Sequence, residues 1–247
     1  MKISIRTEFS KIEPTYTILE HIKDIELAFH FRAEFFSVDI NALLRNIRQM
    51  DLHVNSIHAP ALQLEKAEEF IRGLKRCAKM CTKLECNVLV IHPSKVNDRE
   101  DAIKFIKRGI TPILKKYDLI LAWENFPGHK RIANSVNELV QLITEINEPE
   151  HHSICLDTSH TKAATEDLMR IMTEYKNYFR AYHISNWNAK QQHLPLFHSD
   201  GKINFNKILK PKFFNKDATV TLEYMEEFRI HLNEDYQAVK KALLQTQ

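Results

Sequence analysis

Glycine is scarce in this chain: only four of its 247 residues are glycine, and no two lie close together. Loops that wrap a nucleotide phosphate need clustered glycines, because the backbone must turn sharply and approach the phosphate closely. The sequence therefore contains neither a dinucleotide-binding fingerprint nor a P-loop. This absence also counts against an open doubly wound sheet, which usually carries such a loop after its first strand.

Cysteine and long apolar runs are also rare. The four cysteines include no Cys-x-x-Cys pair, so we expect small buried residues rather than zinc ligands or a redox pair. No apolar run reaches the roughly 20 residues that cross a bilayer. Residues 1–6 have the pattern of a strand and not of a secretory signal. We expect a cytoplasmic protein that does not enter a membrane.

Neither sign of charge dominates, since 35 Lys and Arg residues face 32 Asp and Glu residues for a net charge of +3. The two signs are interleaved, whereas nucleic-acid-binding proteins usually concentrate their cations in a stripe. A small molecule, phosphorylated or not, is therefore a better expected partner than nucleic acid. A chain of this length can also bury a large core without a structural metal, so any metal site must be justified by its chemistry.

Short apolar runs of strand length alternate with longer segments of helical period. We expect strands at 2–6, 24–29, 53–58, 87–92, 118–124, 153–157, 179–185 and 219–223. Helices are expected at 39–50, 63–85, 98–117, 134–147, 163–176 and 233–245, with shorter pieces at 14–22 and 203–210. Continuous apolar runs such as 87–92 are typical of parallel strands covered on both faces. Eight such units without a phosphate loop favour an α/β fold, a closed (β/α)8 TIM barrel, as one domain over residues 1–247.

Six consecutive predicted strands end in a side chain that can bind a metal. In chain order these residues are His58, His92, Glu124, Asp157, His183 and Glu223, with His160 and His193 in the loops that follow. The active site of such a barrel lies at the carboxyl ends of its strands. Side chains alternate along a strand, so Glu124 shares a face with Ala122 and Ile120 while bulky Trp123 points to the helices. These phases predict that the polar side chains converge above the barrel interior.

A single histidine or carboxylate at a strand end is more often an ordinary hydrogen-bonded residue than a ligand. Together, however, these groups would bury several like charges side by side, which is costly unless a cation compensates them. A set of histidines and carboxylates without thiolate favours zinc, manganese or a similar divalent ion. The other histidines assigned to strand starts, helices or distant loops are His21, His30, His53, His151, His152 and His231.

The strand-end segments resemble those of the xylose-isomerase-like barrel superfamily, which includes sugar and sugar-phosphate isomerases and epimerases as well as endonuclease IV. The segments that carry the resemblance are Ile57-His58-Ala59-Pro60, Ile91-His92-Pro93, Glu124-Asn125, Leu156-Asp157-Thr158-Ser159-His160, His183, His193-Leu194-Pro195 and Leu222-Glu223. The epimerase branch implies one metal on Glu124, Asp157, His183 and Glu223. It also implies that the two glutamates move protons and that His160 contacts the substrate.

The endonuclease branch implies three zinc ions. The first would lie on His58, His92 and Glu124, the second on the four residues of the epimerase site, and the third on His160, His193 and an aspartate two residues before that histidine. This chain has Gln191 at the aspartate position and Ala61 where the endonuclease has a tyrosine that helps to open the duplex. A neutral amide is a poorer metal ligand, and without a wedge residue a distorted duplex is hard to stabilise.

We therefore expect a divalent-metal-dependent isomerase or epimerase of a sugar or sugar phosphate, with Glu124 and Glu223 as the catalytic residues. His160, His193 and Gln191 are the expected substrate contacts. The alternative is an apurinic endonuclease or a related phosphoesterase that uses two metals.

Overall fold

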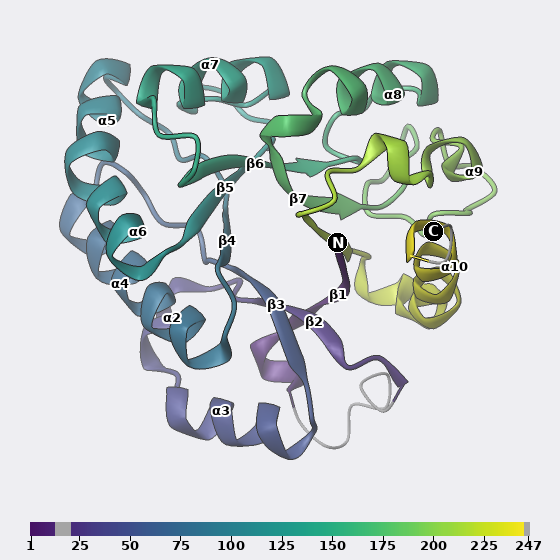
Figure 1. Ribbon diagram of the computed structural model, residues 1–247, viewed down its shortest axis with the longest axis horizontal. Helices are drawn as coiled ribbons and strands as arrows, with labels where there is room; N and C mark the ends of the chain where they lie inside the picture. The colour runs from purple at the N-terminus through teal and green to yellow at the C-terminus, as the bar shows by residue number, and fades with distance from the viewer. Residues whose placement is uncertain (13–20, 245–247) are drawn as a thin grey trace.

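Eight parallel strands close into a barrel in the computed structural model, which describes residues 1–12 and 21–244 (Figure 1). Each strand pairs with the next one along the chain, and β1 pairs with β8, so that Ile3 lies opposite Val220. The strands are β1 (Lys2–Glu8), β2 (Asp24–Ala28), β3 (His53–His58), β4 (Val88–Ile91), β5 (Ile120–Glu124), β6 (His152–Asp157), β7 (Phe179–Ile184) and β8 (Thr219–Leu222). The predicted (β/α)8 barrel is confirmed.

The barrel interior holds small side chains, and the space between barrel and helices holds large ones. A compact inner cluster contains Val88, Val90, Ala122, Cys155 and Ala181. Trp123 is buried in the separate outer core beneath the helices. The alternation predicted for β5 is thus confirmed. All four cysteines are buried and unpaired, as expected.

Helices surround the strands on the outside of the barrel (Figure 1). They are α2 (Arg32–Ser37), α3 (Ile40–Gln49), α4 (Ala67–Leu84), α5 (Arg99–Phe105), α6 (Thr111–Tyr117), α7 (Val136–Ile146), α8 (Thr165–Glu174), α9 (Phe205–Ile208) and α10 (Leu232–Leu244). Short 3-10 turns occupy Phe9–Lys11, Lys176–Tyr178, Pro211–Phe213 and Glu226–His231. No helix in the described ranges is long and apolar enough to cross a membrane.

Local sequence signals set several helix ends. Ser135 accepts a hydrogen bond from the backbone of Glu138, whose side chain bonds back in a capping box, so α7 begins there. Asn147 ends the same helix in the left-handed conformation that asparagine tolerates. Asp39 caps α3 by accepting from the backbone of Asn41.

Three helix predictions need comment. The single helix expected at 98–117 is interrupted by a π-helical turn at Ile106–Ile110, just before Pro112, which lacks the amide proton that a regular helix needs. Helix α2 was not predicted, because its six residues are too few to show a clear period. The piece expected at 14–22 falls almost wholly outside the described residues.

Two strands contain a bulge, and the bulges change which side chains face the barrel interior. The pairing of β2 with β3 steps from Ile25–Val54 to Glu26–Ser56, which leaves Asn55 as an extra residue. Val54 therefore packs in the outer core, while Asn55 and Ser56 both form hydrogen bonds inside the barrel. A similar step in β7 lies between Phe179 and Ala181. Bulges of this kind are common beside active sites, because they redirect side chains.

Candidate metal centre

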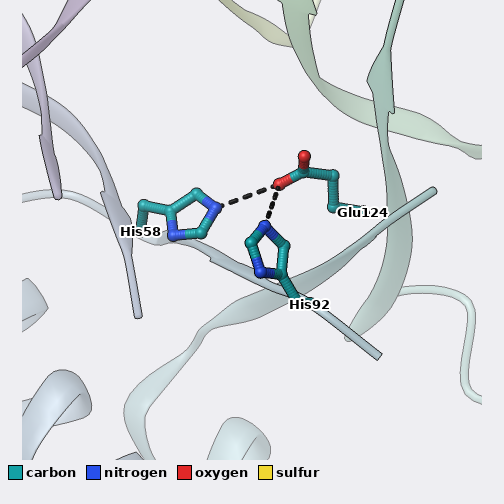
Figure 2. A group of neighbouring side chains, drawn as sticks. All are labelled: His58, His92 and Glu124. Carbon is teal, nitrogen blue, oxygen red and sulfur yellow. Dashed lines mark hydrogen bonds and ion pairs between the residues drawn. The ribbon is translucent and has the colours of Figure 1, made fainter. Parts of the chain in front are cut away.

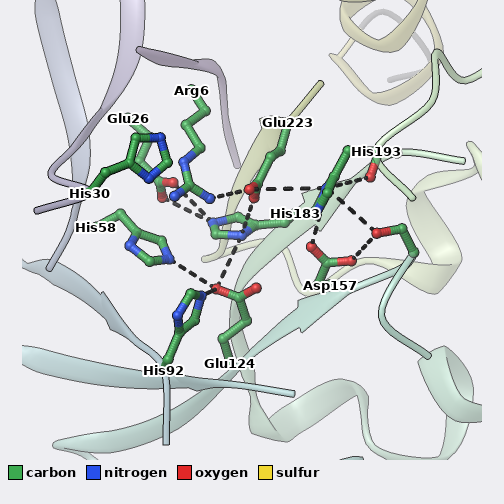
Figure 3. A network of polar contacts seen from close by, with 12 residues as sticks. Arg6, Glu26, His30, His58, His92, Glu124, Asp157, His183, His193 and Glu223 are labelled. Carbon is green, nitrogen blue, oxygen red and sulfur yellow. Dashed lines mark hydrogen bonds and ion pairs between the residues drawn. The ribbon is translucent and has the colours of Figure 1, made fainter. Parts of the chain in front are cut away.

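The carboxyl ends of β3 to β8 bring the predicted polar residues into one cluster (Figure 3). Glu124, Asp157 and His183 are completely buried, and His58 is nearly so. His92, His193 and Glu223 line the cavity above them. Residues separated by more than 160 positions in the sequence therefore meet above the barrel core, as the strand phases predicted.

The innermost group consists of four residues. Glu124, Asp157, His183 and Glu223 each offer one donor atom, and the four atoms lie within 4.8 Å of one another. In the described part of the chain, one buried atom on each of them lacks a hydrogen bond of regular geometry: Glu124 Oε1, Asp157 Oδ2, His183 Nδ1 and Glu223 Oε2. Two of these atoms, His183 Nδ1 and Glu223 Oε2, face each other at 2.8 Å. Buried polar atoms are nearly always paired in folded proteins. A divalent cation would satisfy these donors and offset the three carboxylate charges, so the group fits a metal.

A second group shares Glu124 with the first (Figure 2). The Nε2 atoms of His58 and His92 lie 3.0 and 3.2 Å from the Oε2 atom of Glu124. The two imidazole rings meet edge to face with their centroids 4.8 Å apart. Glu124 is therefore placed where it could bridge two ions.

A third group joins Asp157, His160 and His193. The backbone of His160 donates to Asp157, and the His160 ring lies 3.1 Å from Glu124 Oε1. Gln191 lies outside this group, because its amide donates to Glu227 at 2.9 Å and also contacts the sulfur of Met225. The structure therefore brings every predicted site residue into the cluster except Gln191.

Arg6 and Glu26 belong to the cluster although sequence reasoning did not select them. Arg6, on β1, forms an ion pair with Glu223, and Glu26, on β2, contacts His183 (Figure 3). Each is a charged residue whose strand neighbours are apolar or small, as in Ile25-Glu26-Leu27. A charged residue between apolar or small neighbours on a strand was the sequence signal that could have identified both residues.

His30 was assigned to a position away from the site, and this assignment is wrong. Its ring lines the cavity and lies 3.1 Å from Glu8. His30 lies two residues past Ala28, the last residue of β2, at the carboxyl end of the strand. It therefore stands on the active face of the barrel.

Burial and the neighbouring charges shift the pKa values of the site residues in opposite directions. Burial alone would raise the pKa of Glu124, but His92 and His183 hold it well below its ordinary value. Burial lowers the pKa of His58 to about 4, so this ring is neutral at pH 7. Burial would also lower the pKa of His160, but Asp157 and Glu124 raise it to about 9. At pH 7, His58 is thus neutral and His160 is protonated, beside the ionised carboxylate of Glu124.

A cavity of about 390 Å³ opens above the cluster. Its wall includes Phe126, whose ring centroid lies 4.1 Å from that of the His92 ring. The rim carries the acidic residues Glu8, Glu226 and Glu227. The rim cation Arg229 is engaged by Glu8 and Glu226. The cavity suits a small polar molecule.

The side chain of Asn186 makes several of the hydrogen bonds that hold the loop carrying His193. Asn186 donates to the carbonyl groups of Leu196 and Ile203 and accepts from the backbone of Ile203. Gly201 packs against this amide so closely that an added Cβ would lie 2.2 Å from it. His193 itself has a φ of 57°, a conformation that non-glycine residues seldom adopt. The position of His193 is therefore imposed by the surrounding loop.

The residues of the three donor groups lie within one match to a known family. Residues 22–242 match the family described as xylose isomerase-like TIM barrel, and this range contains every residue of the three donor groups. The chain belongs to the xylose isomerase-like TIM barrel family.

Curated relatives of this xylose isomerase-like chain carry nuclease names. A probable endonuclease 4 of Mesoplasma florum is 31% identical over 98 residues, which are 38% of this chain and 33% of that protein. A probable endonuclease 4 of Acholeplasma laidlawii is 24% identical over 143 residues, 53% of this chain and 48% of that protein. The chain thus spans less than half the length of these relatives.

Solved structures of the same xylose isomerase-like fold cover nearly the whole chain. The probable 3-DHS dehydratase AsbF of Bacillus anthracis has a TM-score of 0.75 at 16% identity and covers 97% of this chain and 99% of its own. The 3-keto-D-glucoside 4-epimerase YcjR of E. coli has a TM-score of 0.70 at 11% identity, covering 98% and 99%. The IOLI protein, solved with zinc, has a TM-score of 0.67 at 14% identity, covering 98% and 96%. At such identities the likeness establishes the fold alone.

Proposed function

We propose that this chain is a divalent-metal-dependent isomerase or epimerase of a sugar or sugar phosphate. One observation carries the proposal: the buried carboxylate of Glu124 and the partly exposed carboxylate of Glu223 approach the same nitrogen of His183 beneath a cavity of small-molecule size. Their Oε2 atoms lie 3.5 and 2.8 Å from His183 Nδ1. Two carboxylates that flank one point can act on the two faces of a substrate carbon.

The metal would be held by Glu124, Asp157, His183 and Glu223, whose unpaired donor atoms fit a cation. When bound, it would polarise the substrate carbonyl and the adjacent hydroxyl and so ease loss of the proton between them. Zinc and manganese both accept this ligand set, and zinc is the ion in one solved neighbour of the same fold.

Glu124 and Glu223 are the residues that transfer protons to and from the substrate. One removes the proton from the carbon beside the carbonyl, and the other returns a proton to the opposite face, or to the neighbouring atom in an isomerisation. Their surroundings differ, because Glu223 is ion-paired with Arg6 while Glu124 is surrounded by histidines. His160, protonated because its pKa is near 9, can donate a hydrogen bond to a substrate oxygen. His193 stands beside it, with ring centroids 5.0 Å apart.

The cavity favours a small polyhydroxy substrate over a duplex. Its volume of about 390 Å³ lies within the range of small-molecule sites. The acidic side chains of Glu8, Glu226 and Glu227 at the rim would repel a phosphate backbone and can accept hydrogen bonds from hydroxyl groups.

A second candidate, phosphoester cleavage at abasic sites in DNA, is favoured by a specific observation. His58 and His92 form a donor group that shares Glu124 with the inner group. A bridging carboxylate of this kind suits two metals that activate water for in-line attack on phosphorus. The curated relatives named endonuclease 4 support the same candidate.

The two candidates differ in whether a carbon–hydrogen bond is broken. Zinc- or manganese-loaded protein should be incubated in D2O with a panel of ketoses and ketose phosphates, and deuterium beside the carbonyl measured by NMR. We expect incorporation that disappears in Glu124→Gln and Glu223→Gln but persists in Glu148→Gln, a control carboxylate that pairs with Lys115 away from the cavity. The absence of exchange across the panel would count against the isomerase proposal.

The same preparations should be offered duplex DNA with one abasic site. We expect binding that is weak at physiological salt and that falls steeply as salt rises, because it would rest on phosphate contacts alone. Efficient metal-dependent incision would promote the second candidate to first.

A further inference from the structure

Carboxylates lie against both ring nitrogens of His183. Nδ1 faces the inner donor group, 2.8 Å from Glu223 Oε2. Nε2 faces Glu26, 3.0 Å from its Oε1 atom and 3.2 Å from its Oε2 atom. Figure 3 shows Glu26 on the side of the ring away from Glu124. Glu26 is therefore not a member of the donor group, although it is completely buried beside it.

Glu26 is itself held in place. The Ser56 hydroxyl donates to its Oε2 atom at 2.8 Å inside the barrel. This contact depends on the bulge in β3, because the extra residue Asn55 is what brings Ser56 opposite Glu26. The bulge at Asn55 and the hydroxyl of Ser56 thus hold Glu26 in contact with the Nε2 atom of His183.

Burying a carboxylate without a partner would be very costly, so Glu26 needs a reason to be there. Besides Ser56, its partner is the His183 ring, whose Nε2 atom lies 3.0 Å from Glu26 Oε1. A metal-binding histidine commonly donates its other N–H to a carboxylate, which fixes the tautomer and makes the free nitrogen a better ligand.

We infer that Glu26 is the positioning residue of the centre, holding the His183 ring so that Nδ1 points at Glu124, Asp157 and Glu223. Ser56 fixes Glu26 in turn. The inference rests on the proposed metal centre but not on which reaction that centre catalyses, so metal affinity tests it separately from turnover.

The test is a graded series at one position, read by zinc affinity in competition with a chelator. Glu26→Gln keeps a hydrogen-bond acceptor and loses the charge, whereas Glu26→Ala loses both. We expect affinity to fall about tenfold in Glu26→Gln and about a hundredfold in Glu26→Ala, the range found for such supporting residues. Glu26→Asp should recover part of the loss, and Ser56→Ala should show a smaller one.

Ser4→Ala is the matched control. Ser4 is also a buried serine of the barrel, and it accepts a hydrogen bond from Asn55. Its loss perturbs packing and a buried hydrogen bond but leaves Glu26 and His183 in contact. Zinc affinity within twofold of the parent in both Glu26→Gln and Glu26→Ala would overturn the inference. So would an equal loss in Ser4→Ala.

A second readout needs no metal and no substrate. The hydrogen-bonded Nε2 proton of His183 should give a slowly exchanging low-field NMR signal, identified by its loss in His183→Asn. We expect Glu26→Gln to move this signal upfield and Glu26→Ala to abolish it through solvent exchange. An unmoved signal in Glu26→Gln would contradict the inference even if the variants bound zinc poorly, and it remains readable where Glu26→Ala does not fold.

Discussion

Two fully buried histidines stand on neighbouring strands and have opposite surroundings. His152 lies behind the sheet, where its Nδ1 atom accepts from the Trp123 indole at 3.3 Å and its Nε2 atom lies 3.0 Å from the Thr111 hydroxyl. His183 lies inside the barrel among Glu26, Glu124 and Glu223. Burial lowers the pKa of His152 to about 4, whereas the negative neighbours of His183 raise its pKa well above the ordinary value in spite of burial.

The difference separates a structural histidine from a functional one. Both nitrogens of His152 are satisfied by neutral partners, so the residue is complete without a ligand. His183 has one nitrogen directed at buried carboxylates that have unpaired oxygens of their own. Burial and residue type are the same in the two cases, and only the charge of the partners distinguishes them. The same comparison identifies which substitutions should matter most.

The largest effect is expected at the inner donor group. Alanine at Glu124, Asp157, His183 or Glu223 removes a direct metal contact, so metal affinity should fall by an order of magnitude or more and turnover should fall with it. Metal content after dialysis, together with chelator competition, measures this. The inner centre would be disproved by four variants that all bind metal as tightly as the parent.

The next largest effect is the contribution of His152 to the pH dependence of the free energy of unfolding. Its pKa of about 4 in the folded state lies below its ordinary value of 6.5, so between these pH values only the unfolded chain takes up the proton. The stabilising contribution is complete above pH 6.5 and is lost as pH falls towards 4. It amounts to about 3 kcal/mol, from about 1.4 kcal/mol for each unit of pKa difference.

Urea unfolding of the parent and of His152→Phe at pH 7 and pH 4.5 checks this value. We expect the variant to be less stable at pH 7 but to lose less stability on acidification. Val239→Ala provides the control, because it lowers stability in the buried core without removing a titrating group. Equal losses in the parent and in His152→Phe would show that His152 does not govern acid stability.

A smaller effect is expected at the outer histidines. If one metal serves isomerase chemistry, His58 and His92 bind substrate rather than the catalytic ion. His58→Ala should then raise KM, by about tenfold for a lost buried contact of roughly 1.4 kcal/mol, and should retain the inner metal. The measurement is metal content and steady-state kinetics of His58→Ala and His92→Ala. Loss of a whole metal equivalent together with nearly all of kcat would rule out the one-metal arrangement.

The fold and most of the site could be predicted because both depend on short-range patterns. Continuous apolar strands indicated the barrel, and polar residues at the ends of six consecutive strands indicated the active face. Alternation then assigned Glu124 to the interior and Trp123 to the exterior, as the structure has them. These features can be read within a few residues of one another.

What was missed depends on contacts distant in sequence or on backbone irregularities. Glu26 joins the site through His183, 157 residues away, and Arg6 joins it through Glu223, 217 residues away. The bulge at Asn55 breaks the alternation on which the strand phases relied. His30 lies two residues past the end of β2, and periodicity does not indicate which way a loop side chain turns. Sequence periodicity contains none of this information.

The close packing of Gly201 against Asn186 has a consequence for how this barrel could acquire a new substrate. Any side chain at position 201 would displace the amide that ties the His193 loop together. Positions 186 and 201 are therefore linked, and a mutational library that varies either one alone would yield mostly inactive clones. Diversity introduced at the rim residue Glu226, which pairs with Arg229 outside this loop, would leave the hydrogen bonds of Asn186 in place. Substitutions at the rim are therefore a more accessible route to a new substrate than substitutions in this loop.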